Sequence, residues 1–376
     1  MSNSVDVLYI LSHTPDNRYR KRFETLRDLS QFVVYWNKTG ESQKLVLPIG
    51  CESVDIKANQ TNPLKRLPET ARFAEEAAKL VPLYDPKVLY VGNLDMLHIA
   101  YQYKHTHPQV KVVYEIADLH RLIVDRQTGI KSLVRSMLRA REAKDIGCVD
   151  LLVLTSMKFY DVYYRDLIDK DKVLFLPNMP ILEAFRDYDP KKHPEGFTVG
   201  FFGWIRYLDQ LNLLIDAAER AHVNVLFAGS DNSGDAFRKT CGARDYVEYY
   251  GPYDYESEIA SLYERVDCIY SVYDADLFNV RVALPNKLYE SIYCEKPIIV
   301  AKNTYLAEQA ARLGVGVAVD HKDTDELVSV LGELKDRGDA YQAITSRCKN
   351  EKKSISPKSF DEKFEKRILG LLRDAK

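Results

Sequence analysis

Residues 268–301, CIYSVYDADLFNVRVALPNKLYESIYCEKPIIVA, contain a complete strand–loop–helix–strand pattern. One run of apolar and β-branched residues ends near Tyr273, and a second spans residues 297–301. Between them a helix is predicted to begin at Pro285, because proline lacks an amide hydrogen and fixes φ near the helical value. Leu288 and Ile292 lie one turn apart on this helix and mark its buried face. The stretch therefore predicts one βαβ unit of a parallel sheet.

The same alternation continues along nearly the whole chain. In the first half, strands are expected at residues 5–11, 32–36, 88–91, 110–116, 151–155 and 173–176. In the second half, they are expected at residues 199–202, 223–228, 247–250, 268–272, 297–301 and 315–319. Strands that alternate with amphipathic helices form parallel sheets covered on both faces, so the predicted fold class is α/β.

The alternation breaks once, at residues 177–197, where four prolines and mixed charges are typical of a linker. The chain has 376 residues, which exceeds the roughly 250–300 residues that a single core supports. We therefore expect two domains, residues 1–180 and residues 198–356. Residues 357–376 are expected to form an amphipathic helix that packs back on the first domain.

Composition narrows the class of protein. A net charge of −2 excludes a globally basic nucleic-acid-binding protein, so no nucleic-acid partner is expected. The six cysteines are far apart and form no CxxC pair, which argues against a zinc site. Residues 1–20 lack the pattern of a signal peptide, and no apolar run reaches the ~20 residues that span a bilayer. We expect a cytoplasmic protein, with any membrane contact being peripheral. The 25 tyrosines are interpreted mainly as amphipathic packing residues.

Two charged residues of the opening stretch share one helix face. Lys287 and Glu290 are three residues apart. The amino end of a helix, with free N–H groups and partial positive charge, favours a diphosphate, and Lys287 adds a cation there. The Glu290 carboxylate can accept hydrogen bonds from two neighbouring ribose hydroxyls. An ordinary ion pair on a solvated helix explains the same spacing, and spacing alone favours that explanation.

The run LPNKLYESIYCEKPIIVA at residues 284–301 resembles the C-terminal signature of the family 4 retaining glycosyltransferases. This resemblance implies a GT-B fold, in which two Rossmann-like, doubly wound domains face each other across a cleft. It also implies that Glu290 binds the donor ribose. The family's first glutamate, which contacts the donor sugar, falls on Val282, so donor-sugar recognition stays open.

Other segments of the second half carry the same resemblance. TVGFFGWIR (198–206) is similar to the family's strand and glycine loop, where Gly203 lets the backbone approach a diphosphate and Arg206 contacts the leaving group. A plain strand–helix turn with a surface arginine is the alternative. The runs VLFAGS (225–230) and VEYYGPYDYESEIASLYERVDCIY (247–270) also resemble family segments. The implied donor-binding residues are Gly203, Arg206, Gly229, Pro252, Tyr253, Asn286, Lys287 and Glu290.

Basic residues follow the first predicted strand. HTPDNRYRKRFETL (13–26) is similar to a basic family element, and Asp16 can cap its helix. Cations at a helix amino end oppose the macrodipole, so helix propensity does not explain them. They are candidates for binding an anionic acceptor such as a lipid-linked pyrophosphate, and a solvated charged turn is an equal alternative. The residues concerned are Arg18, Arg20, Lys21 and Arg22.

VVYEIADLH (112–120) resembles the family's segment at the cleft, with the family's histidine falling on Ala117. Asp118 and His120 are therefore the candidate catalytic residues. Asp118 is the stronger of the two, because it follows a buried strand and a single histidine is usually structural. The basic amphipathic helix at residues 131–146 is of a kind that can lie on an anionic membrane, although a crossover helix with one solvated face is more common.

The triplet Asp274-Ala-Asp276 resembles the metal-binding DxD motif of the other glycosyltransferase fold. In the GT-B fold, basic residues and a helix amino end neutralise the diphosphate instead. The resemblance therefore implies that neither a metal nor another cofactor is needed.

The function implied by the resemblance is transfer of a sugar, with retention, from a UDP- or GDP-sugar to a hydroxyl. The acceptor would be a saccharide or a polyprenyl-linked saccharide of bacterial surface-polysaccharide synthesis, at the inner face of the membrane. A catalytically silent glycosyltransferase-like partner subunit and a sugar-nucleotide epimerase of the same fold are the alternatives. A nicotinamide-dependent enzyme requires GxGxxG after a first strand, and residues 11–17 contain no glycine.

Overall fold

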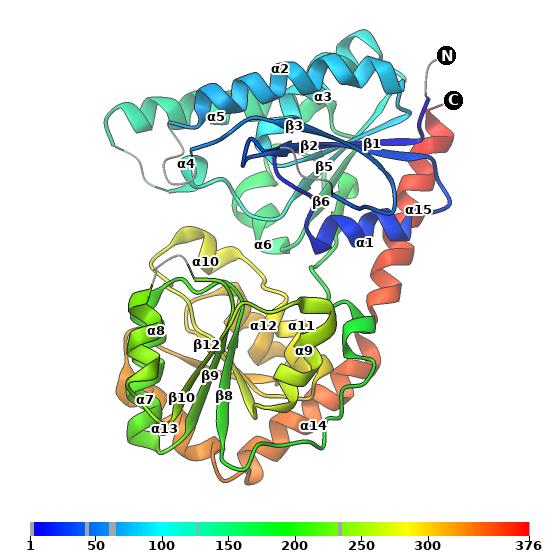
Figure 1. Ribbon diagram of the computed structural model, residues 1–376. Helices are drawn as coiled ribbons and strands as arrows, with labels where there is room; N and C mark the ends of the chain where they lie inside the picture. Colours follow the sequence, from blue (N-terminus) through cyan, green and yellow to red (C-terminus); the bar gives the residue numbers. More distant parts are fainter. Residues whose placement is uncertain (1–3, 42–44, 60–64, 126–127, 232–234, 376) are drawn as a thin grey trace. The chain divides into compact units, whose positions relative to one another are not determined.

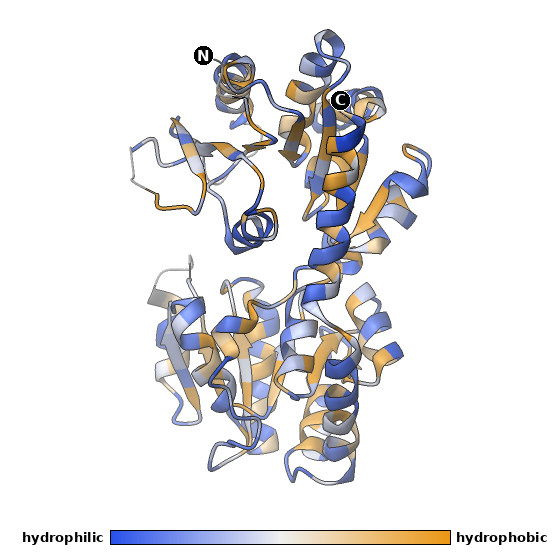
Figure 2. Cartoon of the chain, turned by 90° about the vertical axis from the view of Figure 1, so that its right-hand side faces the viewer, coloured by the Kyte–Doolittle hydropathy of each residue, from blue (hydrophilic) through white to orange (hydrophobic). Residues whose placement is uncertain are grey.

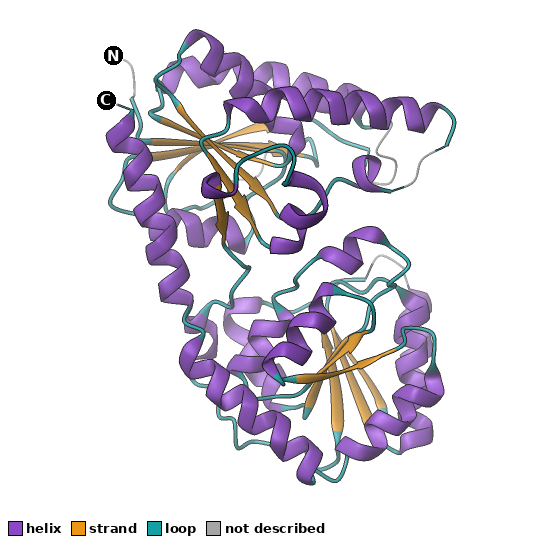
Figure 3. Cartoon of the chain, turned by 180° about the vertical axis from the view of Figure 1, so that it is seen from behind, coloured by secondary structure: helices purple, strands orange, loops and turns teal. Residues whose placement is uncertain are grey.

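The computed structural model describes residues 4–41, 45–59, 65–125, 128–231 and 235–375. The chain divides into two compact units: Met1–Pro177 with Lys358–Lys376, and Asn178–Pro357. Each unit contains one parallel sheet with helices on both faces (Figures 1 and 3). The predicted α/β class is therefore confirmed.

The first sheet has the strand order β3-β2-β1-β4-β5-β6-β7, and all pairs are parallel. The order reverses at β1, which pairs with β2 on one side and β4 on the other. Doubly wound sheets bind ligands outside the carboxyl ends of the strands at this switch point. The strands are β1 (Val7–Leu11), β2 (Gln31–Asn37), β3 (Gly50–Asp55), β4 (Val88–Gly92), β5 (Lys111–Ile116), β6 (Leu151–Leu154) and β7 (Val173–Phe175).

The second sheet has the order β10-β9-β8-β11-β12-β13 and is also entirely parallel. Its switch point lies between β8 and β11, because β8 pairs with both β9 and β11. The loops after β8 and β11 therefore meet where a ligand is expected. The strands are β8 (Thr198–Phe202), β9 (Asn224–Ala228), β10 (Val247–Gly251), β11 (Cys268–Ser271), β12 (Ile298–Ala301) and β13 (Gly316–Val319).

Helices cover both faces of each sheet. Those of the first unit are α1 (Asn17–Thr25), α2 (Leu67–Tyr84), α3 (Leu94–Thr106), α4 (Arg121–Val124), α5 (Ile130–Asp145), α6 (Met157–Phe159) and α15 (Pro357–Asp374). Those of the second unit are α7 (Leu208–Ala221), α8 (Asp235–Gly242), α9 (Tyr255–Glu264), α10 (Phe278–Val282), α11 (Lys287–Tyr293), α12 (Tyr305–Leu313), α13 (Thr324–Leu334) and α14 (Asp339–Ser354).

The core of the first unit lies between its sheet and helices α1 and α15. Tyr19 and Phe23 of α1 and Phe364 and Ile368 of α15 are buried against β1, β2 and β4. Figure 2 shows the strands as the most hydrophobic segments and the helices as mixed, which is the pattern of amphipathic helices around a buried sheet. Helix α15 thus belongs to the first unit although its sequence follows the second.

Every strand expected from the sequence is present, but β3 was missed. Its sequence GCESVD has no apolar run, and its residues are only half-buried or exposed. β3 is the edge strand and pairs with β2 alone. An edge strand with solvent on one side can carry polar residues, so the pattern used for buried strands does not detect it.

A buried ion cluster fastens α1 to the sheet. Glu115 of β5 is fully buried, and its Oε1 lies 3.2 Å from Nη2 of Arg22 and 3.8 Å from Nε of Arg18. The hydroxyl of Tyr90 donates a hydrogen bond to Oε2. Burial alone would raise the pKa of Glu115, but the positive charges of Arg22 and Arg18 hold it below its usual value. The guanidinium of Arg22 also lies 5.4 Å from the ring of Phe364, so the cluster connects α1, β5 and α15.

Replacing Glu115 with alanine is expected to destabilise the first unit by about 3–5 kcal/mol, because two arginines remain buried without their carboxylate. Urea unfolding followed by Trp36 fluorescence measures this effect, since Trp36 is fully buried in β2. The exposed Trp204 of the second unit is replaced by phenylalanine throughout. Glu24→Ala is the control, because it removes an exposed pair with Arg27 on the same helix, worth about 0–1 kcal/mol. Equal urea midpoints for the two variants would contradict the role given to Glu115.

Candidate functional site

Three glycines lie at the carboxyl edge of the second sheet, where Gly203 and Gly229 follow β8 and β9 and Gly251 ends β10. Gly203, Gly229 and Gly251 have φ angles of 137°, 154° and 93°, which side chains rarely tolerate. The amide of Gly229 donates to the carbonyl of Gly251 at 2.8 Å, and a Cβ on Gly229 would lie 1.6 Å from the carbonyl oxygen of Gly203. No described atom comes within 4 Å of the corresponding Cβ position on Gly203. The backbone at Gly203 is therefore open to a ligand.

Arg206 lies three residues beyond this turn. Its side chain is exposed, and its guanidinium carbon lies 5.1 Å from the ring centre of Tyr207. Tyr207 in turn lies 5.6 Å, between ring centres, from Tyr273. Since Tyr273 follows β11, these contacts join the loops after β8 and β11 at the switch point.

Glu290 is the centre of a buried polar cluster on α11. Its side chain is fully buried, and both oxygens are occupied. Oε1 accepts from the Tyr255 hydroxyl at 2.8 Å and from Asn286 Nδ2 at 2.7 Å. Oε2 accepts from the Tyr263 hydroxyl at 2.8 Å and from Lys287 Nζ at 2.6 Å. A ribose that binds Glu290 has to replace one of these four donors.

Lys287 is also buried. Burial alone would lower the pKa of its ammonium group, but the adjacent Glu290 carboxylate outweighs this and raises it. Tyr253 lies close enough to interact with Lys287. Because burial raises the pKa of Tyr253, its hydroxyl is neutral and adds no negative charge beside Lys287. The pair is therefore a buried ion pair and not the solvated one that spacing alone favoured. Lys287 is a charge held in place, with little exposed surface of its own.

The structure thus brings Tyr253, Asn286, Lys287 and Glu290 into one cluster. Pro252 is exposed beside Tyr253, and the glycine turns with Arg206 lie on neighbouring loops. Helix α11 begins at Lys287, two residues later than expected, and is only seven residues long.

Sequence reasoning missed the two tyrosines that bind Glu290. Tyr255 and Tyr263 lie on α9, eight residues apart, and both face its buried side. The available signal was the spacing of Tyr255, Ile259 and Tyr263, which places both tyrosines on the apolar face of this helix. The sequence interpretation used only the loop before this helix.

The four basic residues of α1 do not form one patch. Arg18 and Arg22 are one turn apart and face the interior, where they meet Glu115. Arg20 and Lys21 are half-exposed. Arg18 and Arg22 therefore form neither a solvated charged turn nor an exposed cationic surface. Glu115, a charged residue inside an apolar strand sequence, was the signal for a buried partner.

The candidate catalytic residues follow β5. Asp118 is exposed, and His120 is half-buried at the N-cap position of α4. The Nδ1 atom of His120 is buried and has no hydrogen-bond partner among the described residues.

A second buried carboxylate, Glu142 of α5, lies near His120. It accepts hydrogen bonds from the hydroxyls of Tyr114, Tyr163 and Tyr164 at 2.9, 2.6 and 2.9 Å. Burial raises the pKa of Glu142, and the tyrosine hydrogen bonds and the charge of His120 oppose that shift only in part. Sequence analysis did not identify this cluster.

Among the described residues, one group offers a possible metal site. Ligand atoms of Asp274, Asp276 and His321 lie within 4.8 Å of one another, after β11 and β13. Asp276 already forms an ion pair with Lys322 at 2.5 Å. The sequence-based expectation that no metal is required stays a prediction.

Among the described helices, none has both the length and the apolar character that crossing a bilayer requires.

No protein-family profile matches the chain. It is 27% identical over 282 residues to the succinoglycan biosynthesis protein ExoL of Rhizobium meliloti, which covers 70% of this chain and 68% of ExoL.

Solved structures with the same fold include the glycosyltransferase WaaG and sucrose-phosphate synthase. Sucrose-phosphate synthase from Thermosynechococcus elongatus has a TM-score of 0.68 at 13% identity, over 96% of this chain and 97% of that chain. HepE from Anabaena, in complex with UDP-glucose, has a TM-score of 0.66 at 14% identity, over 96% of this chain and 98% of that chain. Likeness at this identity shows the fold, which is GT-B as the sequence resemblance implied.

Proposed function

We propose that the protein is a glycosyltransferase that moves a sugar from a nucleoside-diphosphate sugar to an acceptor hydroxyl. The observation that carries this proposal is the open turn at Gly203 beside the exposed Arg206, at the switch point of the second sheet. HepE, which shares the fold, is known in complex with UDP-glucose, so a UDP-sugar is the first donor to test and a GDP-sugar the second.

The geometry supports a specific division of roles. The diphosphate approaches the Gly203 backbone, and Arg206 stabilises the departing diphosphate through charge-assisted hydrogen bonds. Glu290 binds the ribose after exchanging one of its present donors, and it holds Lys287 in position. We also propose that the protein belongs to the family 4 glycosyltransferases and retains the configuration at the transferred carbon.

On the acceptor side, we propose that Asp118 and His120 lie near the reacting hydroxyl. Arg20 and Lys21 are the half-exposed cations of α1, and we propose that they contact an anionic acceptor. The likeness to ExoL favours a saccharide, free or lipid-linked, of surface-polysaccharide synthesis. A cytoplasmic location at the inner face of the membrane belongs to the same proposal.

One observation favours a second candidate, a catalytically silent partner subunit. Val282, at the position of the family's sugar-contacting glutamate, is a buried apolar residue of α10. It can neither donate nor accept a hydrogen bond from a donor sugar through its side chain.

Arg206→Ala is expected to weaken UDP binding about tenfold or more, because a charge-assisted hydrogen bond is lost. Isothermal titration calorimetry with UDP measures it. Arg220→Ala is the matched control, since Arg220 is exposed at the opposite end of α7 and its pair with Asp325 is also exposed. Substitutions of Lys287 or Glu290 are less informative, because they also break a buried ion pair. Equal affinities of the two variants, or no binding of UDP or GDP by the wild type, would refute the donor site.

Transfer from radiolabelled UDP-sugars to a bacterial membrane extract is expected to proceed in excess EDTA, because the exposed Arg206 supplies the positive charge. Product analysis by chromatography and NMR gives the acceptor and the anomeric configuration. Loss of activity that Mg²⁺ restores would contradict the metal-free mechanism and direct attention to Asp274, Asp276 and His321. An isomerised nucleotide sugar formed without acceptor would indicate an epimerase, and donor binding without transfer would indicate the silent subunit.

We also propose that α5 contacts an anionic membrane. Leu133 and Met137 are 62% and 64% exposed. The exposed charged residues of this helix are all basic, because its two acidic residues are buried. Such a surface is complementary to anionic lipids. These exposed cations are Lys131, Arg139, Arg141 and Lys144.

The double variant Leu133→Ser/Met137→Ser is expected to lose most co-sedimentation with phosphatidylglycerol vesicles. Phosphatidylcholine vesicles should bind the wild type poorly. Leu83→Ser is the control, because Leu83 is similarly exposed on α2. Unchanged sedimentation of the double variant would rule out this surface.

A further inference from the structure

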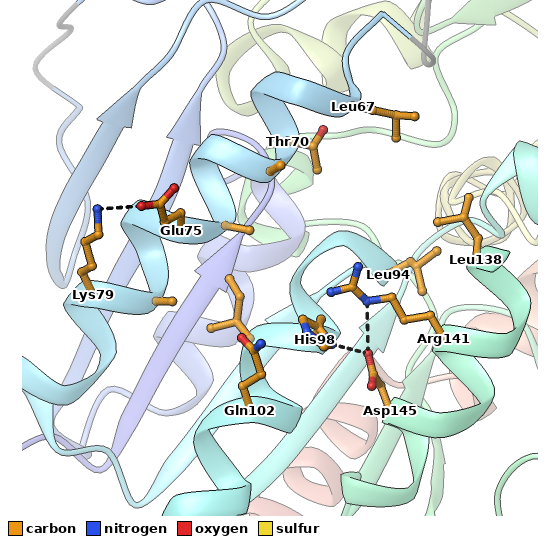
Figure 4. A pocket seen from close by; sticks show the side chains of 14 residues that line it. Leu67, Thr70, Glu75, Lys79, Leu94, His98, Gln102, Leu138, Arg141 and Asp145 are labelled. Atoms are coloured by element: carbon orange, nitrogen blue, oxygen red, sulfur yellow. Dashed lines mark hydrogen bonds and ion pairs between the residues drawn. The ribbon is translucent and has the colours of Figure 1, made fainter. Parts of the chain in front are cut away.

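A pocket of about 610 Å³ lies between α2, α3 and α5 in the first unit (Figure 4). This volume is within the range of roughly 300–1,000 Å³ that small-molecule sites occupy. None of the residues proposed above for donor or acceptor binding lines it. The pocket is therefore a separate cavity that the proposed reaction does not yet use.

One wall of the pocket is apolar and formed by small residues. Ala71, Ala74 and Ala78 recur along one side of α2, and Ile99 of α3 and Leu138 of α5 lie across from them. Because alanine side chains are short, α2 leaves room for a ligand along this wall. A hydrocarbon chain placed there would remove apolar surface from water.

The other side of the pocket is polar. It contains Arg141 beside Asp145, while Lys79 and Glu75 of α2 pair with each other at 3.2 Å. Asp145 is buried at its base, and its Oδ2 lies 2.8 Å from Nδ1 of His98 and 3.7 Å from Nε of Arg141. Figure 4 shows the Arg141 guanidinium reaching from α5 toward the middle of the pocket. Half of the Arg141 side chain is exposed, so its remaining N–H groups are accessible to an anion. Asp145 therefore orients a cation beside the apolar wall.

The surroundings of the pocket fit an amphipathic ligand. Leu67, which lines it, is an exposed leucine on α2, and α5 carries the exposed Leu133 and Met137. The exposed charges of α5 are basic, as described above. The apolar wall, the half-exposed Arg141 guanidinium and the apolar rim together match a hydrocarbon chain with a phosphate head.

We infer that this pocket binds the chain of an isoprenoid phosphate, the carrier of the acceptor saccharide. The chain lies along the alanines of α2, and Arg141 binds the phosphate through charge-assisted hydrogen bonds. His98 and Asp145 are positioning residues that fix Arg141. This inference rests on the proposed glycosyltransferase function and specifies its acceptor as lipid-linked.

Calorimetry with farnesyl diphosphate, kept below its micelle concentration, tests the inference. Wild-type protein is expected to bind it, and Ala74→Phe, which fills the space along the apolar wall, is expected to weaken binding at least tenfold. Arg141→Gln should weaken binding by about tenfold, because it removes the charge. Lys131→Gln is the matched control, since it removes an exposed charge of the same helix outside the pocket. Circular dichroism checks that each variant is folded.

Three further probes separate the contributions. Farnesol is expected to bind more weakly than farnesyl diphosphate, and equal affinity would refute phosphate recognition. Inorganic diphosphate is expected to bind poorly, and affinity equal to that of farnesyl diphosphate would refute binding of the chain along the apolar wall. Dihexanoylphosphatidylglycerol tests an ordinary membrane lipid, and affinity equal to that of farnesyl diphosphate would refute the isoprenoid assignment. An unchanged affinity of Ala74→Phe would place the chain elsewhere and overturn the inference.

Different results would contradict the ligand of this pocket and the donor site of the second unit. If the inference is right, Ala74→Phe binds UDP as the wild type does, because its pocket lies in the first unit and Arg206 in the second. It should raise KM for a lipid-linked acceptor at least tenfold with little change in kcat. Failure to bind UDP in the wild type refutes the donor site and leaves the farnesyl diphosphate result standing. Normal UDP binding without farnesyl diphosphate binding refutes the pocket alone.

Discussion

A carboxylate removed from water has to be matched by hydrogen-bond donors or positive charge, and this fold contains several such carboxylates, three of them glutamates. Glu115, Glu142 and Glu290 are each at most 1% exposed. An unmatched buried charge costs several kcal/mol, so each cluster determines which helix packs over which part of the sheet. Glu115 fixes α1 over β5, Glu142 fixes α5 over the same strand, and Glu290 fixes α11 beside α9.

Tyrosine hydroxyls are the donors common to all three clusters. They are neutral, so they satisfy a carboxylate without adding a second charge to the interior. The charge of the remaining partners then decides the direction of the pKa shift. Two arginines lower the pKa of Glu115, whereas Glu142, bound by three tyrosines, has a raised pKa. The abundance of tyrosine is therefore partly explained by polar satisfaction and not by amphipathic packing alone.

In the second unit, the same principle shows which residues of the proposed nucleotide site are accessible to a ligand. Lys287 and Glu290 neutralise each other inside the protein, and α11 is too short for its dipole to be the main source of positive charge. The accessible groups are the open Gly203 turn and Arg206. Binding of a diphosphate is therefore expected to depend first on these two residues, while the buried pair keeps the surrounding tyrosines in place.

The sequence by itself determined the α/β class and every strand except β3, because buried parallel strands are continuous apolar runs whatever their partners. It also singled out the PNKLYE segment through its resemblance to a family signature, while spacing alone placed Lys287 and Glu290 on one helix face. Only the tertiary structure showed that Arg18 and Arg22 meet Glu115, that Tyr263 meets Glu290, and that α2, α3 and α5 enclose a pocket. These contacts join residues far apart in the chain, and local spacing carries no information on which distant side chain satisfies a buried charge.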